Sequence, residues 1–102
     1  MTPQPSRLSI DQTPNNTLVV EGVIDSHTAD QLMERLQDLG TESDITLNLQ
    51  QVEFIDSSGL RIIITSHQDL ASAGHRLVLD GISDAVARLL EITGLREHLH
   101  TT

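Results

Sequence analysis

The chain has 102 residues, of which 37% are apolar, with one Phe and no Trp, Tyr, Cys or Lys. This length suits a single domain whose core is built from Leu, Ile, Val and Ala. Fifteen acidic residues against six arginines give a formal net charge of -9, which repels phosphate backbones, so direct nucleic-acid binding is excluded. The lack of cysteine excludes disulfides and thiolate chemistry.

The chain contains no apolar run long enough to cross a membrane, so no membrane insertion is expected. The opening segment, MTPQPSRLSI, lacks the basic region and apolar core of a secretory signal. We therefore predict a cytoplasmic protein. Residues 1–6, with two prolines, are expected to fray, and residues 7–102 are expected to form one domain.

Four strands are predicted. Leu8 and Ile10 alternate with polar residues and are followed by the turn-like TPNN and then by TLVVEGVI, which indicates an antiparallel hairpin. The third strand is ITLNL, with Ile45, Leu47 and Leu49 on one face, and the fourth is RLVL at residues 76–79.

Three main helices are predicted between the strands. Their apolar stripes comprise Ala29, Leu32, Met33, Leu36 and Leu39 in the first, Leu60, Ile63, Ile64, His67 and Ala71 in the second, and Val86, Leu89 and Leu90 in the third. They stop before Gly40, Gly74 and Gly94, and a short fourth helix is expected after Gly94. The fold class is therefore α/β, a small, mainly parallel four-stranded sheet with an N-terminal antiparallel hairpin strand and three to four helices.

The segment FIDSSGL, residues 54–60, lies between a strand and the second helix. Asp56, Ser57 and Ser58 are typical helix caps, and capping alone explains such a cluster. One cap is sufficient, however, so if Asp56 or Ser58 caps the helix, Ser57 remains free. Gly59 sacrifices about 1 kcal/mol of helix propensity relative to Ala, and its missing side chain lets the backbone of another molecule approach.

The helical wheel places Ser58, Arg61, Ile62, Thr65 and Asp69 opposite the apolar stripe. Ile62 is therefore expected in solvent, as an anchor for a partner. A lone exposed Ile is also common and needs no functional explanation.

A second acidic and hydroxyl pair, Asp25 and Ser26, stands before the first helix. Parallel strands bring this loop and the Asp56–Ser58 loop to the same edge of the sheet, where sites in open α/β folds gather. Capping explains Asp25 or Ser26 equally well.

Three motifs in this chain resemble the STAS domain family, and within it the small anti-sigma factor antagonists of bacteria. They are G-x-I-D at residues 22–25, V-x-F-I-D-S-S-G-L at residues 52–60 and L-L-E-I-T-G-L at residues 89–95. They occur in the family's order, at about its spacing, and cover nearly the whole chain.

The resemblance implies that Ser57 is phosphorylated by an anti-sigma factor that is a serine kinase of the histidine-kinase-like ATPase fold. It implies that the unphosphorylated chain binds this kinase and frees the sigma factor, and that a PP2C-type phosphatase resets it. It also implies that Asp25 and Asp56 lie near Ser57. The predicted partner surface is completed by Ser58, Gly59, Leu60, Arg61 and Ile62.

Arg61 departs from the family pattern, which favours a small residue there. It is expected either to pair with the phosphate or a kinase acid, or to alter the choice of partner. The alternative function is a STAS interaction module of a lipid-transport ABC system or of a stressosome-type complex.

No enzymatic activity is expected, because the sequence lacks the G-x-S-x-G elbow of serine hydrolases and the P-loop. His67 is expected to be a satisfied residue at the core edge. EHLH, at residues 97–100, is a weak metal pattern that reads better as a solvated chain end. We predict no metal and no cofactor.

Overall fold

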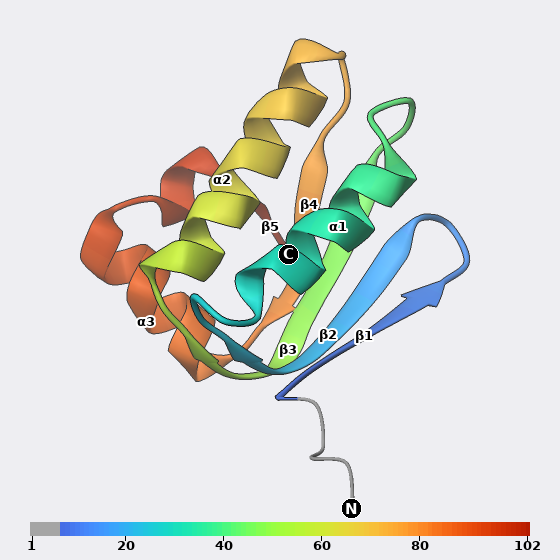
Figure 1. Cartoon of the computed structure of the whole chain (residues 1–102). Coiled ribbons are helices and arrows are strands. Elements are labelled where there is room, and N and C mark those ends of the chain that lie inside the picture. The colour runs from blue at the N-terminus through green and yellow to red at the C-terminus, as the bar shows by residue number, and fades with distance from the viewer. Residues whose placement is uncertain (1–6) are drawn as a thin grey trace, which may run out of the picture.

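The computed structural model describes residues 7–102, and the predicted frayed segment 1–6 lies outside the described residues. The elements follow one another as strands and helices in alternation after an initial hairpin (Figure 1). They are β1 (Leu8–Thr13), β2 (Thr17–Ile24), α1 (Ala29–Leu39), β3 (Ile45–Ile55), α2 (Ser57–Ser72), β4 (Leu77–Ile82), α3 (Asp84–Thr93), the 3₁₀ helix η1 (Arg96–His98) and β5 (His100–Thr101).

The strands form one sheet in the order β1-β2-β3-β4-β5. β1 and β2 are antiparallel and all the other neighbours are parallel, which confirms the predicted α/β class and the N-terminal hairpin. The hairpin turn contains Asn15 and Asn16 at positive φ, a conformation that Asn tolerates better than most residues. The predicted short helix after Gly94 is η1.

The sheet has five strands rather than the predicted four, because residues 100–101 pair with Val78 and Leu79 of β4. Glu97, His98 and His100 are exposed, as expected for a solvated chain end, but Leu99 is buried, so the prediction is wrong for this residue. A strand of two residues is too short to show any periodicity. His67 lies at the core edge as predicted, with its ring centroid 5.8 Å from that of His100, but its Nδ1 has no hydrogen-bond partner within residues 7–102.

β3 continues well past Leu49, where the sequence predicted that it would end. Its second half pairs only with β2, and the registers slip next to Val19 and Asn48, which breaks the apolar alternation that marks a strand. α3 packs against β3 beyond the point where β4 diverges. The longer strand leads directly into the FIDSSGL segment, with only Asp56 between β3 and α2.

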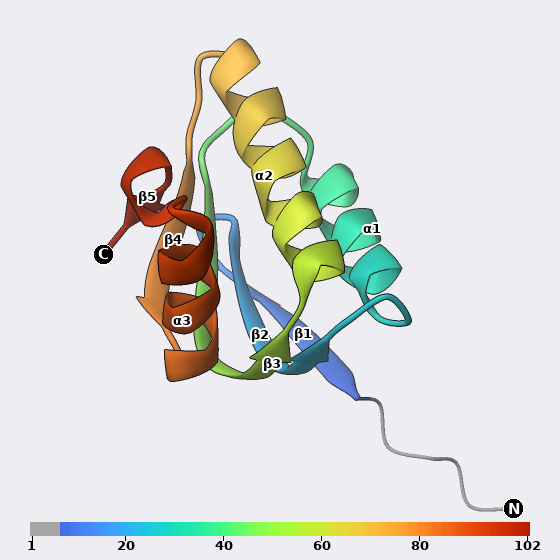
Figure 2. The ribbon, with the colours of Figure 1, turned by 90° about the vertical axis from the view of Figure 1, so that its left-hand side faces the viewer.

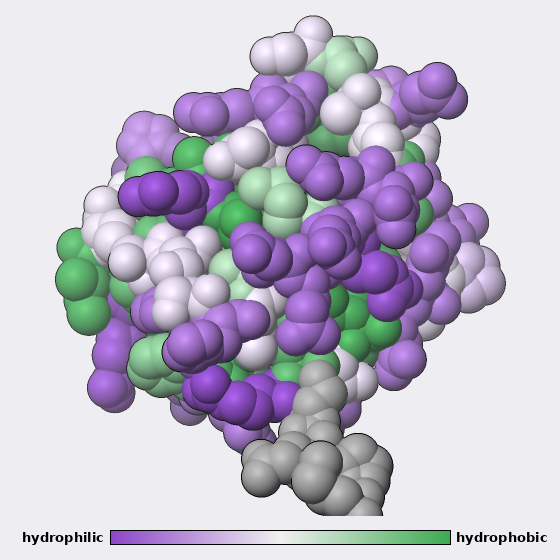
Figure 3. All heavy atoms as spheres, in the orientation of Figure 1, coloured by the Kyte–Doolittle hydropathy of each residue, from purple (hydrophilic) through white to green (hydrophobic). Residues whose placement is uncertain are grey.

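Helices α1 and α2 lie side by side over the sheet, and α3 stands apart from them (Figures 1 and 2). The core between the layers is almost entirely Leu, Ile and Val, as the composition predicted. The outer face of α1 and α2 is mostly hydrophilic, with small separate hydrophobic areas (Figure 3). Among the described residues, no helix combines the length and the apolar character needed to traverse a bilayer.

The buried face of α2 differs from the predicted stripe. Leu60 and Ile63 are buried as expected, but Ala71 is exposed, and Ile62 is only 7% exposed. The prediction that Ile62 faces solvent is therefore wrong. The helical wheel of α2 alone cannot include α1, which packs beside it and covers a second face.

Candidate functional site

The two predicted loops meet at one edge of the sheet. Ile24 at the end of β2 is paired with Ile55 at the end of β3, and the Asp56 N–H donates to the Ile24 carbonyl at 3.1 Å. Asp25 and Asp56 therefore directly follow two residues that face each other on neighbouring strands, Ile24 and Ile55. Both helices begin at this end of the sheet (Figure 1), so the expected proximity of the loops is confirmed.

Asp56 is the N-cap of α2. Its Oδ1 accepts hydrogen bonds from the Ser58 N–H at 2.8 Å and the Gly59 N–H at 3.3 Å. Of the two caps that the sequence allowed, the structure selects Asp56. A phosphate on Ser57 would consequently find these two N–H groups already occupied.

Ser57 is the first residue of α2 and is exposed, whereas Ser58 is half-buried. Neither hydroxyl forms a hydrogen bond to any group within residues 7–102. Because Asp56 caps α2, the Ser57 hydroxyl stabilises no other group in the part of the chain that the structure describes. This is the division of labour predicted from the sequence.

Asp25 organises the loop before α1. Its Oδ1 accepts from the His27 N–H at 2.9 Å and the Thr28 N–H at 3.2 Å. Thr28, the N-cap residue of α1, uses its hydroxyl to accept from the Asp25 N–H and to donate to the Val23 carbonyl at 2.7 Å. Ser26 is left exposed in this loop.

Arg7 and Asp25 form an ion pair, with Nη2 and Oδ2 2.5 Å apart. Burial by itself would raise the pKa of Asp25. The hydrogen bond from the His27 N–H, the charge and hydrogen bond of the Arg7 guanidinium and the bond from Thr28 outweigh this effect and hold the pKa below its ordinary value. Asp25 is therefore a carboxylate at neutral pH.

At two positions of the family motifs, Gly22 and Gly59, the structure leaves no room for a side chain. Gly22 has φ +108°, and a Cβ there would lie 2.2 Å from the Arg7 carbonyl oxygen. A Cβ on Gly59 would lie 2.5 Å from Ile24 Cγ2 and 2.9 Å from Ile55 Cγ1. Gly59 faces inward, so its missing side chain lets α2 approach the ends of β2 and β3. The prediction that it lets the backbone of another molecule approach is therefore wrong.

A shallow hollow of about 260 Å³ lies between the starts of α1 and α2. Its lining residues come from both loops and both first turns: Ser26, Ala29, Asp30, Ser57, Ser58, Arg61 and Ile62. The structure thus brings together Ser57, Ser58, Arg61 and the edge of Ile62, whereas Gly59 and Leu60 are buried beneath them. Sequence reasoning missed Asp30, although an acid in the first turn of a helix opposite a predicted site was a usable signal.

Within residues 7–102, no three His, Cys, Asp or Glu side chains are grouped so that they could hold a metal ion. The groups available at the hollow are instead the hydroxyls of Ser26, Ser57 and Ser58, together with Arg61 and Asp30. Such a site can be recognised or modified by another protein. Within residues 7–102, no side chain that could act as a general base is hydrogen-bonded to the Ser57 hydroxyl.

Comparison with known proteins identifies the family of the chain. The model of the STAS domain family matches residues 7–102, so the chain belongs to the STAS domain family. An anti-sigma-B factor antagonist of Staphylococcus aureus is 35% identical over 83 residues, which cover 79% of this chain and 77% of that protein.

Two solved structures share the fold. The anti-sigma factor antagonist SpoIIAA in its unphosphorylated form has a TM-score of 0.72 at 21% identity, covering 93% of this chain and 87% of that one. The Bacillus cell fate determinant SpoIIAA in the phosphorylated form has a TM-score of 0.67 at 20% identity, covering 93% and 90%. At this identity the likeness concerns the fold.

Proposed function

We propose that this chain is an anti-sigma factor antagonist that binds an anti-sigma factor when unphosphorylated and is released by phosphorylation of Ser57. The observation that carries the proposal is the free, exposed Ser57 hydroxyl beside an Asp56 that already caps α2. The name of the S. aureus relative supports the same role. The chain acts as a binding protein and not as an enzyme.

Phosphorylation changes charge rather than fold in this proposal. A phosphate adds about -1.5 to -2 charges at a helix N-terminus, where the dipole favours negative charge. Asp30 and Asp56 lie near the new charge, and Arg61 lines the same hollow one helical turn beyond Ser57. Arg61 partly balances the charge of the phosphate within this chain. A partner whose surface fitted the neutral hydroxyl would have to bury the new negative charge against its own negative groups.

The energetic effect is sufficient for a switch. Juxtaposing like charges across an interface costs several kcal/mol, and each 1.4 kcal/mol is about tenfold in affinity. A single phosphate therefore converts tight binding into negligible binding without unfolding the chain.

The partner surface is centred on the hollow. Ser57, Ser58 and Arg61 contact the partner directly, while Asp25 and Asp56 fix the two loops around them. Gly59, Leu60 and Ile62 are mostly buried. They therefore contribute to this surface by shaping its floor.

The finer identity of the partners follows the family resemblance. The anti-sigma factor is a serine kinase of the histidine-kinase-like ATPase fold, and a PP2C-type phosphatase removes the phosphate. The cycle takes place in the cytoplasm and regulates sigma-factor-dependent transcription.

The test uses the anti-sigma kinase from the same organism with Mg-ATP. Wild type and Ser58→Ala should accept phosphate and then leave the kinase. Ser57→Ala should accept none and remain bound, and Ser57→Asp should bind at least tenfold more weakly. Phosphate located by mass spectrometry on protein purified from its own cells should be at Ser57.

Equal binding of the kinase by Ser57→Ala and Ser57→Asp would contradict the proposal. That result, with a different co-purifying protein, would favour the alternative of a STAS interaction module in a transport or stressosome-type complex.

A further inference from the structure

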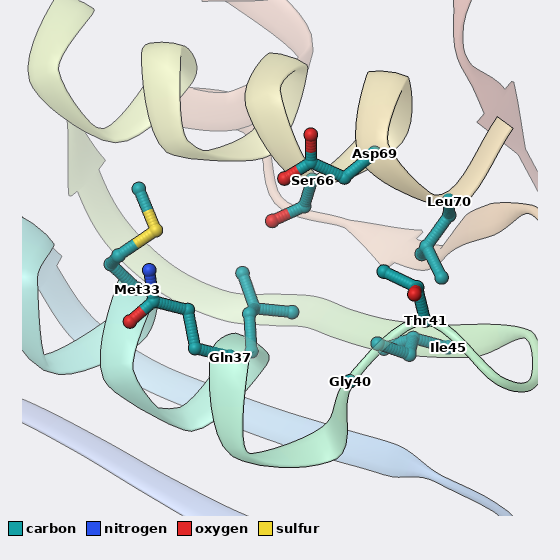
Figure 4. A pocket seen from close by; sticks show the side chains of 9 residues that line it. Met33, Gln37, Gly40, Thr41, Ile45, Ser66, Asp69 and Leu70 are labelled. Atoms are coloured by element: carbon teal, nitrogen blue, oxygen red, sulfur yellow. The ribbon is translucent and has the colours of Figure 1, made fainter. Parts of the chain in front are cut away.

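A second pocket lies between α1 and α2, in the half of the two helices away from Ser57 (Figure 4). Its volume is about 200 Å³, below the roughly 300–1,000 Å³ of drug-sized sites, so it suits a small molecule. The floor and walls are partly apolar, from Met33, Leu36 and Leu70, and partly polar, from Gln37, Ser66 and Asp69.

Ser66 is a buried polar residue without a partner. It is 8% exposed, and its hydroxyl forms no hydrogen bond within residues 7–102. Figure 4 shows its oxygen directed into the pocket. The oxygen is open to the pocket and has no protein partner among the described residues, so it is available to a donor group that enters the pocket.

Asp69 gives the pocket its charge. It follows Ser66 by three residues, so the two side chains lie on one face of α2, and both line the same pocket (Figure 4). Among the described residues, Asp69 has no ion-pair partner, and the pocket is lined by no other charged residue. Two adjacent acceptors above an apolar floor are matched by a donor group on a short hydrocarbon chain.

We propose that this pocket binds a small organic cation, a primary alkylammonium, with the ammonium on Asp69 and Ser66 and the alkyl chain on Met33, Leu36 and Leu70. The ammonium donates to the carboxylate and the hydroxyl together, a charge-assisted arrangement stronger than a neutral one. The net charge of -9 draws cations toward the surface. The proposed cation site does not depend on the function proposed for Ser57.

The pocket is separate from the hollow at Ser57. Ser66 and Asp69 follow Ser57 by nine and twelve residues of one helix, which corresponds to about 14 and 18 Å at 1.5 Å per residue. A ligand on Asp69 therefore leaves the Ser57 hydroxyl open. The two sites share the same pair of helices, α1 and α2.

The test is a titration of the full-length chain with n-pentylammonium chloride, followed by amide NMR shifts and matched with n-pentanol and with sodium chloride at equal ionic strength. Saturable shifts are expected at Gly40, Thr41 and residues 66–70, and not at Ser57. Asp69→Asn should weaken binding about tenfold or more, and Ser66→Ala should weaken it to a smaller extent.

Asp38→Asn is the matched control, because Asp38 is an exposed acid of α1 that does not line the pocket. It should leave the dissociation constant within about twofold, as expected for a screened surface charge. The proposal is overturned if no saturable shifts occur at the pocket, if pentanol binds as tightly as pentylammonium, or if Asp38→Asn weakens binding as much as Asp69→Asn.

Discussion

The guanidinium of Arg7 and the carboxylate of Asp25 are joined by an ion pair that links the residue before β1 to the loop before α1. The same segment is held a second time, because the Val23 N–H donates to the Arg7 carbonyl at 2.8 Å. The loop that flanks Ser57 is therefore positioned by a residue eighteen places earlier in the chain. Its geometry therefore depends on this distant residue as well as on the hydrogen bonds among residues 23–28.

The ion pair predicts a pH-dependent effect of Arg7→Gln. The folded pKa of Asp25 is lowered, so its contribution to stability is present above the ordinary pKa of Asp and is lost as the pH falls through the folded pKa. Arg7→Gln should lower the melting temperature at neutral pH, and the difference from wild type should shrink in acid. By NMR titration, the Asp25 pKa should rise in the variant, because the charge and the hydrogen bond of Arg7 both lower it in the wild type.

Arg88→Gln, an exposed arginine of α3, is the control for the loss of one positive charge. It should leave the Asp25 pKa unchanged. If both variants shift the Asp25 pKa equally, the effect is one of net charge and the ion pair has no specific role.

Asp56→Ala should destabilise the fold by about 0.5–2 kcal/mol, because the Ser58 and Gly59 N–H groups lose their acceptor. Asp56→Asn should recover most of this loss, since its amide oxygen caps equally well. Denaturant unfolding measures both variants. Equal destabilisation by Ala and Asn would show that charge, and not capping, is what Asp56 provides to the fold.

Gly59→Ala should destabilise the chain by about 1–3 kcal/mol, because the added methyl overlaps Ile24 and Ile55. The gain of about 1 kcal/mol that Ala brings to an exposed helix position offsets only part of the cost of this overlap. Thermal unfolding should show a drop of about 4–8 °C per kcal/mol. Gln68→Ala, at an exposed position of the same helix, should unfold at nearly the wild-type temperature.

Ile62→Ala should cost about 2–5 kcal/mol, as for a buried aliphatic side chain. The neighbouring Arg61→Ala should change stability by less than about 0.5 kcal/mol, because Arg61 is exposed. Chemical denaturation of the two variants side by side makes the comparison. If Ile62→Ala does not change stability, the burial of Ile62 is contradicted and the side chain faces solvent, as the helical wheel predicts.

The local pattern of the sequence was sufficient for much of the fold. The apolar stripe of α1, its end at Gly40 and the third helix from Ser83 to Gly94 follow from interactions within four residues along the chain, and the structure contains all of them. The spare serine beside a capping aspartate was predictable for the same reason, since a helix start needs one cap. The adjacency of the Asp25 and Asp56 loops followed from the parallel sheet alone.

Other features depended on contacts between elements distant in the sequence. Ile62 is buried because α1 covers it, Gly59 faces Ile24 and Ile55, and β5 exists only because β4 offers it a free edge. Asp30 joins the Ser57 hollow, and Ser66 faces a pocket with Asp69, only once α1 and α2 lie side by side. A sequence pattern reports one helix or strand at a time, whereas burial and site composition are set by the neighbours that the packed layers supply.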